Sequence, residues 1–138
     1  MKSEDLVFDT GVVFEILIGS AEGAKTLQLI EKNRISVYIS ELNLTELKYI
    51  ICRKYGEELT EEIIGRLLGS GYFEVSPFPS IANEVWRTKC KYSISLADSA
   101  TITLGEVLGL KSVFRREKEL LAKRLPGHVK FLDEIMNQ

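Results

Sequence analysis

The chain has 138 residues, a length that fits one domain and leaves no room for two ordinary ones. Its 20 acidic and 18 basic residues give a formal net charge of −2, so it lacks the basic excess that dedicated nucleic-acid binders usually carry. Two cysteines without CxxC spacing and a single histidine, His128, argue against a disulfide scaffold and a zinc site. Because there is no signal-like or membrane-spanning apolar run, we expect a soluble, cytoplasmic protein.

The first half of the chain predicts two strands and four helices. Leu6-Val7-Phe8 ends at Asp9-Thr10-Gly11, as a short buried strand followed by a turn does. The further elements predicted here are helices over 12–18 and 21–32, a strand over 35–39, a helix over 41–55 capped by Ser40, and a helix capped by Thr60 that stops near Gly69.

The second half continues the alternation of strands and helices. It predicts a strand over 72–75, a helix over 81–91, a helix over 96–108 capped by Ser95 and ended by Gly109, a strand over 111–114, a charged helix over 117–124, and a strand over 128–132 that runs into a helical turn.

This order predicts an α/β fold with three layers, in which helices cover both faces of a mainly parallel sheet. One domain over residues 1–138 accounts for the whole pattern, since the chain has no internal repeats and no evident linker. In open sheets of this kind, ligands bind at the carboxyl ends of the strands, near the topological switch point. We therefore look for the functional site among residues that follow predicted strands.

Four carboxylates fall where that edge is expected. Asp9 closes the first strand, Glu46 lies in the second turn of the helix after the second strand, and Asp98 lies in the first turn of a later helix. Glu117 follows the fourth strand. Hard cations such as Mg²⁺ or Mn²⁺ bind a few carboxylates plus water. Two such ions about 4 Å apart can clamp the attacking and leaving oxygens of a phosphoryl displacement. The pattern predicts a divalent-metal site.

Three of these carboxylates have a purely structural alternative. Asp9 can serve only as a helix N-cap. Ser95 and Asp98 have the spacing of a capping box, although a cap would also point Asp98 at a site beside the helix N-terminus. Glu117 lies in a charged turn whose side chains can simply be solvated.

Glu46 is harder to explain structurally. Leu42, Tyr49 and Ile50 lie on the same helix face, which predicts that its carboxylate is set on an apolar stripe. A buried charge without a partner is costly, so Glu46 needs either a metal ion or a nearby basic side chain.

Four segments of the chain together resemble the PIN-domain family, and the resemblance covers nearly the whole sequence. They are LVFDTGVVFEIL, YISELNLTELKYII, YSISLADSATITLGEVLGL and SVFRREKEL. The third segment is the most specific, because it joins Ser95-Leu96-Ala97-Asp98 to small residues and a helix that ends in Leu-Gly.

The resemblance implies an endoribonuclease that uses Mg²⁺ or Mn²⁺, with a catalytic set of Asp9, Glu46, Asp98 and Glu117. Asp9, Glu46 and Asp98 would be the metal ligands. Thr10 and Ser40 would be the neighbouring donors that orient these ligands.

One position departs from the family pattern. Glu117 takes the place of the last Asp, and Arg115-Arg116 precede it in place of a small Thr-Gly pair. These arginines could bind the RNA phosphate or fill the site electrostatically. An alternative is therefore a catalytically weakened PIN domain that acts as an RNA-binding or protein-interaction module.

Small PIN proteins of this length resemble the VapC-type toxins of toxin–antitoxin pairs. This likeness implies an RNA substrate, a small antitoxin partner and a homodimer. The apolar face of the helix pair between Leu42 and Leu68 is a candidate partner surface, although most of these residues can equally belong to an ordinary core.

Two other acidic α/β families fit the sequence less well. Haloacid-dehalogenase-like phosphatases need a second Asp two residues after the first, where this chain has Gly11. Receiver domains need a phosphoacceptor Asp after the third strand, where Pro77 and Pro79 stand instead.

Overall fold

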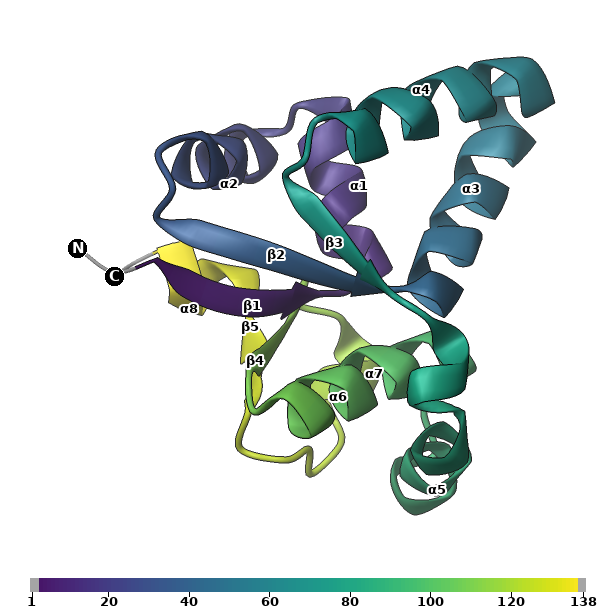
Figure 1. Cartoon of the computed structure of the whole chain (residues 1–138). Helices are drawn as coiled ribbons and strands as arrows, with labels where there is room; N and C mark the ends of the chain where they lie inside the picture. The colour runs from purple at the N-terminus through teal and green to yellow at the C-terminus, as the bar shows by residue number, and fades with distance from the viewer. Residues whose placement is uncertain (1–2, 137–138) are drawn as a thin grey trace.

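The computed structural model describes residues 3–136, so that 1–2 and 137–138 of the predicted domain lie outside the described range (Figure 1). The strands are β1 (Glu4–Phe8), β2 (Ile35–Ser40), β3 (Phe73–Ser76), β4 (Lys111–Phe114) and β5 (Val129–Phe131). The helices are α1 (Thr10–Ile18), α2 (Ala21–Glu31), α3 (Glu41–Tyr55), α4 (Glu57–Gly69), α5 (Ala82–Tyr92), α6 (Leu96–Leu108), α7 (Lys118–Leu121) and α8 (Leu132–Met136), with a 3-10 turn at Phe78–Ser80. Within residues 3–136, no helix is both long and apolar enough to cross a bilayer.

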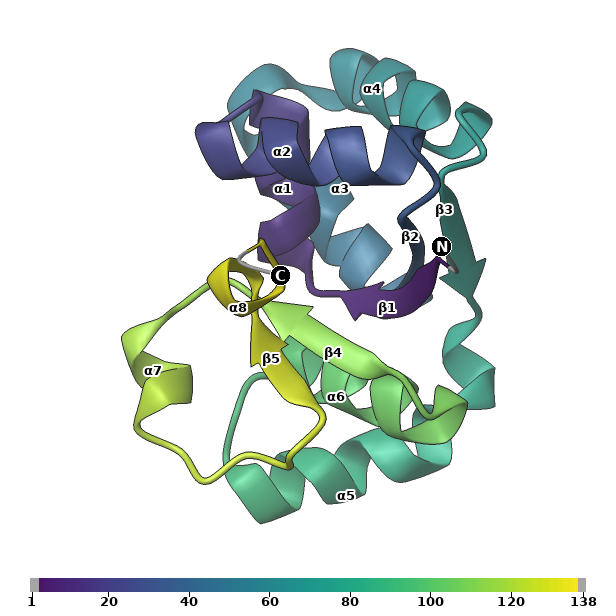
Figure 2. The same ribbon diagram turned by 90° about the vertical axis from the view of Figure 1, so that its left-hand side faces the viewer.

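The five strands form one sheet in the order β3-β2-β1-β4-β5, and every neighbouring pair is parallel. Figure 2 shows α1 to α4 on one side of this sheet and α5 and α6 on the other. The predicted three-layer α/β fold is thereby confirmed. The chain leaves β1 towards β2 and later returns to pair β4 with the other side of β1, so the topological switch lies beside the end of β1.

Three apolar clusters of described residues hold the layers together, and β1 contributes to two of them. Leu6 and Phe8 point to the side of α1, α2 and α3, whereas Val7 points to the side of α5 and α6. All three side chains are fully buried, as expected for the central strand of a sheet covered on both faces. Because both faces of β1 are packed, the backbone of Asp9, the residue after this strand, is held in a fixed position.

Helix caps place the two helices that matter most for the site. Ser40 accepts a hydrogen bond from the backbone N–H of Asn43, and α3 covers the residues predicted for it. Ser95 accepts one from the N–H of Asp98, and Gly109 ends α6 in the left-handed conformation at φ 69°. The sequence prediction of both helices is confirmed.

Two predicted helix boundaries are wrong. The helix attributed to a Thr60 cap begins one turn earlier, at Glu57, after Gly56, whose φ is positive at 88°. Thr60 lies inside α4, where its hydroxyl donates to the carbonyl of Gly56. The charged helix predicted over 117–124 is only the single turn Lys118–Leu121, in which Leu120 is buried.

Candidate active site

Asp9 lies directly after β1 and is buried, with 5% of its surface exposed. It occupies the N-cap position of α1, yet its side chain forms no capping hydrogen bond with that helix. Burial, followed by the charge of Asp98, raises the pKa of Asp9 to about 8. The backbone of Gly11, in the first turn of α1, opposes this rise, so the Asp9 carboxylate lies between the start of α1 and other acidic groups.

Two side chains hold the Asp9 carboxylate from different helices. Nδ2 of Asn43 in α3 donates to Oδ1 of Asp9 over 3.1 Å, and Oγ1 of Thr101 in α6 donates to the same oxygen over 2.9 Å. Both donors are fully buried. Oδ2 of Asp9 receives neither of these two bonds.

Asp98 lies in the first turn of α6 and is half-buried. Burial raises its pKa to about 6, against the opposing effect of a hydrogen bond with the Ser95 side chain. The charges of Glu117 and Glu46 add to the rise. Asp98 thus both belongs to a capped helix start and shares an electrostatic environment with other carboxylates.

Glu46 and Glu117 approach this pair from two further elements. Glu46 is half-buried on α3, and its charge raises the pKa of both Asp9 and Asp98. Its helix face is the apolar stripe that the sequence predicts, but no other element of the described chain covers it, since Tyr49 is 63% and Ile50 36% exposed. Glu117 is exposed at the N-cap position of α7, at the rim of the group.

The donor set fits a hard divalent cation. The charges of Asp98 and Glu46 act on Asp9, and those of Glu46 and Glu117 act on Asp98. None of these four carboxylates forms an ion pair with a Lys or Arg of residues 3–136. Across that same range, no three acidic, His or Cys side chains lie close enough together to hold a metal ion by themselves. Such a group suits a cation that binds a few carboxylate oxygens and keeps several waters.

Thr10 and Ser40, the two predicted neighbouring donors, both bond to Asn43. The Thr10 hydroxyl donates to the backbone carbonyl of Asn43 and accepts from its side-chain amide. The Ser40 hydroxyl donates to Oδ1 of Asn43. Both residues are buried, and they act on Asp9 through Asn43.

The two predicted phosphate ligands are half-exposed and already paired. Nε of Arg115 lies 3.1 Å from Oε1 of Glu15, and its aliphatic stem passes over Gly11 beside Asp9. Arg116 pairs with Asp133 at 2.9 Å and lies over the ring of Phe131.

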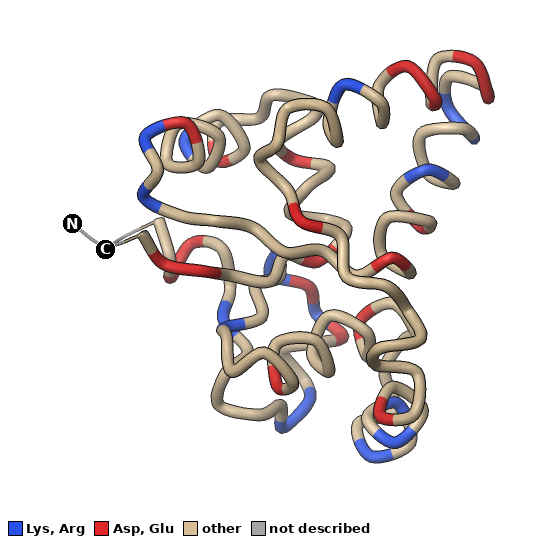
Figure 3. Tube along the Cα trace, viewed as in Figure 1, with Lys and Arg blue, Asp and Glu red and all other residues tan. Residues whose placement is uncertain are grey.

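The other basic side chains are spread over several helices, as Figure 3 shows. In that view the lowest helix, α5, carries Arg87, Lys89 and Lys91. All three of these side chains are exposed.

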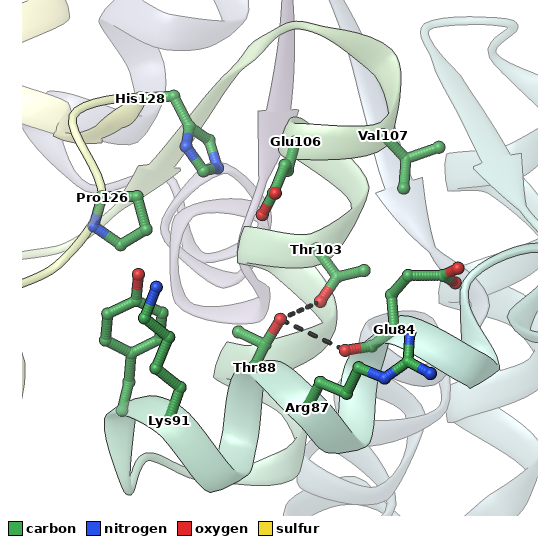
Figure 4. A pocket seen from close by; sticks show the side chains of 10 residues that line it. Glu84, Arg87, Thr88, Lys91, Thr103, Glu106, Val107, Pro126 and His128 are labelled. Carbon is green, nitrogen blue, oxygen red and sulfur yellow. Dashed lines mark hydrogen bonds between the residues drawn. The ribbon is translucent and has the colours of Figure 1, made fainter.

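A cavity of about 550 Å³ lies between α5, α6 and the segment before β5 (Figure 4). Its lining includes Arg87, Lys91 and His128, and the hydroxyls of Thr88 and Thr103 are hydrogen-bonded to each other over 2.9 Å. None of the predicted site residues lines it. A second, shallower groove of about 340 Å³ adjoins the carboxylates and is lined by Leu42, Thr45, Glu46, Tyr49, Ser95, Leu96 and Ala97.

Sequence reasoning missed Asn43 and Thr101. Each stands three residues from a predicted ligand on the same helix: Asn43 before Glu46, and Thr101 after Asp98. That spacing puts each pair on one helix face, so it could have identified both polar side chains as neighbours of the site.

Comparison with known proteins places the chain in a family. A scan against protein-family profiles matches the PIN domain over residues 6–124, which is most of the sequence. The chain belongs to the PIN domain family, as the sequence motifs predict. A search of curated protein sequences gave no match.

Solved structures share the fold at low sequence identity. A VapBC2 structure from Rickettsia felis, bound to a promoter DNA fragment, matches with a TM-score of 0.68 and 16% identity, over 92% of this chain and 96% of that one. VapC20 of Mycobacterium tuberculosis, described as a toxin that cleaves the sarcin-ricin loop, matches with a TM-score of 0.65 and 14% identity, over 85% and 94%. PAE2754 from Pyrobaculum aerophilum matches with a TM-score of 0.64 and 20% identity, over 99% and 96%. These likenesses establish the fold.

Proposed function

We propose that this chain is a divalent-metal-dependent endoribonuclease of PIN type and the toxin of a toxin–antitoxin pair. One observation carries the proposal: a buried Asp9 shares its surroundings with Asp98 and Glu46 and has no basic partner within the described residues. Carboxylates held close together without a cation favour binding of a positive ion.

Asp9, Glu46 and Asp98 are the residues that would hold Mg²⁺ or Mn²⁺. Such ions, when bound, supply a nucleophilic water at neutral pH and stabilise charge on a phosphoryl group. The protein fixes Asp9 at the end of a buried strand and Asp98 in a capped helix turn, so both carboxylates are oriented before a substrate arrives. Glu117 supports the group from the exposed rim.

The substrate class is supported by the site and by one relative. Divalent ions held by carboxylates suit phosphoryl displacement, and the similar VapC20 structure is described as that of a sarcin-ricin loop cleaving toxin. Arg115 lies beside Asp9 with about half of its side chain exposed, so it can exchange Glu15 for a phosphate of the RNA backbone.

Two partners belong to this proposal. VapBC structures from Rickettsia felis and Salmonella typhimurium, both bound to DNA, match the chain, which supports a small antitoxin as partner. The helix pair α3–α4 exposes Tyr55, Leu59 and Leu68, and these residues make it a candidate surface for that antitoxin. A second copy of the chain is the other proposed partner.

Cleavage of a mixed RNA pool tests the central activity. Wild-type protein with Mn²⁺ should cleave the RNA, and EDTA should stop the reaction. Asp98→Asn removes a ligand while leaving the Ser95 cap on the backbone intact, so it should abolish cleavage. Glu106→Gln is the control, because Glu106 is an exposed carboxylate on the same helix that lines the remote cavity instead of the site. This variant should cleave RNA as wild type does. Equal cleavage by Asp98→Asn and wild type would show that Asp98 only stabilises the start of α6 and is not a metal ligand.

A weakened nuclease that works by binding is the second candidate. The exposed position of Glu117, together with its replacement of the family's usual Asp, favours it. Wild-type protein that binds RNA with Mn²⁺ but does not cut it, while Glu117→Asp cuts, would establish this second function.

A further inference from the structure

Asn43 lies at the centre of the candidate site, and no role was predicted for it from the sequence. It lies in the first turn of α3, three residues before Glu46, and its side chain is fully buried. A buried side-chain amide has to satisfy two donors and an acceptor, so its partners define what it does.

The amide joins three segments of the chain. Nδ2 lies 3.1 Å from each of three oxygens: Oδ1 of Asp9 after β1, Oγ1 of Thr10 in α1, and the backbone carbonyl of Ala97 in α6. The Ala97 carbonyl belongs to the residue next to Asp98. One side chain of α3 therefore contacts the segments that carry two of the other predicted ligands.

The orientation of this amide is fixed from its other end. The Ser40 hydroxyl donates to Oδ1 of Asn43 and accepts the backbone N–H of the same residue. Ser40 thereby directs the NH₂ group of Asn43 towards Asp9. An Asp at this position would supply no donor and would add a like charge beside Asp9, and a shorter hydroxyl side chain would offer one donor in place of two.

The bond to Asp9 selects one of its oxygens. Asn43 and Thr101 both donate to Oδ1, from helices on opposite sides of the sheet, so this oxygen is held from both layers. Oδ2 receives neither of these two bonds. Hydrogen bonds of this kind orient a metal-binding carboxylate and raise the affinity of its site.

We propose that Asn43 is a positioning residue that aims the Asp9 carboxylate at a divalent cation and ties α3 to the start of α6 across the site. This role rests on the proposed metal-dependent function. It predicts that loss of the Asn43 amide weakens binding of the metal itself, before any RNA is present.

Titration calorimetry with Mn²⁺ on the full chain tests the proposal. Asn43→Leu keeps a similar volume and removes the amide, and its Mn²⁺ affinity should fall by about 10-fold or more, the size typical of lost outer-sphere partners. Thr101→Val removes the other hydrogen bond to Oδ1 of Asp9 and should also lower the affinity for Mn²⁺. Thr88→Val is the matched control, because it removes a buried hydrogen bond on the far side of α6 and should leave the affinity unchanged (Figure 4).

The outcomes separate this role from the proposed function. Wild-type protein that binds no Mn²⁺ would overturn both. Wild-type binding that Asn43→Leu matches in affinity would overturn the positioning role alone, and so would an equal loss of affinity in Thr88→Val, which would show a general effect of destabilisation. If Asn43→Leu does not fold, Asn43→Ser answers the same question, since it removes the amide and keeps a polar group. Cleavage by either folded variant should need more Mn²⁺ for half-maximal rate and recover at saturation.

Discussion

Asp9 is a carboxylate whose ionisation the fold opposes. It is buried beside Asp98 and Glu46, and these surroundings raise its pKa from 3.8 to about 8. A raised pKa means that the folded chain holds a proton that the unfolded chain releases. The stability linked to this proton is fully present below pH 3.8 and is lost as the pH rises through about 8.

We predict that Asp9→Asn stabilises the metal-free protein at alkaline pH. Asn keeps an oxygen for the donors of Asn43 and Thr101 but removes the charge, so in EDTA at pH 8 the variant should melt at a higher temperature than wild type. Near pH 5 the difference should shrink, because wild-type Asp9 is then protonated. Thermal melts across this pH range measure the effect.

Adding Mn²⁺ should reverse this difference in melting temperature between wild type and Asp9→Asn. The metal favours the ionised carboxylate, so the melting temperature of wild type should rise at pH 8 while Asp9→Asn loses most of that rise. An equal response of both proteins to Mn²⁺ would show that Asp9 is not a ligand.

Glu117 is predicted to matter less than the other three carboxylates. It is exposed on the rim, and fixing its longer side chain costs up to about 1.5–2 kcal/mol of conformational entropy. Glu117→Gln should therefore lower the rate of RNA cleavage by about 10-fold, an effect of the size expected for a supporting group. Glu117→Asp should keep the activity or improve it. Complete loss of cleavage in Glu117→Gln would instead make Glu117 a primary ligand.

At the scale of secondary structure, most elements could be predicted because local chemistry decides them. Ser40 and Ser95 cap α3 and α6 as their sequences indicate, and Gly109 ends α6. The start of α4 could not be predicted from Thr60, because Gly56 takes a positive-φ conformation that lets the helix begin a turn earlier. The charged run after Glu117 forms only a short turn, whose place is set by the burial of Leu120.

The candidate site divides in the same way. Asp9 and Asp98 could be selected from sequence, because strand ends and helix starts are local features and parallel strands bring their carboxyl ends to one edge. The amide of Asn43 could not be assigned, since its bonds to Asp9 and Ala97 cross 34 and 54 residues of chain. The exposure of Tyr49 was likewise missed, because an apolar helix stripe does not reveal whether another element covers it.

The contact between α6 and β4 is predicted to be intolerant of a single methyl group. A Cβ on Gly105 would overlap the buried hydroxyl of Ser112, which donates to the carbonyl of Thr101 over 2.7 Å. We expect Gly105→Ala to lower the free energy of unfolding by about 1–3 kcal/mol, as overpacking does. Urea unfolding measures this change.

Gly65→Ala is the matched control, because it also lies within a helix but meets nothing within 4 Å. It should raise the free energy of unfolding by about 0.5–1 kcal/mol through helix propensity alone. If Gly105→Ala behaved like Gly65→Ala, the packing of α6 on β4 would be looser than the structure shows.

At the scale of the whole molecule, apolar surface lies next to the carboxylates. The groove beside Glu46 is lined by Leu42, Tyr49 and Leu96, and Tyr49 and Leu96 are 63% and 45% exposed. Contiguous exposed apolar surface marks an interaction site in soluble proteins. A partner that covers it would also shape access to the acidic group.

We predict that the wild-type chain is a homodimer at micromolar concentration and that this groove lies in the interface. Replacing Tyr49 and Leu96 together by Ser removes apolar area from the contact, so the double variant should be a monomer in size-exclusion chromatography with light scattering. Ile18→Ser is the control, because Ile18 is 53% exposed at the end of α1 and does not line the groove. A wild-type monomer would contradict the dimer. A dimer that survives the double substitution, with thermal melts showing that the variant is folded, would instead place the interface on another face and leave the groove beside Glu46 open to a different partner.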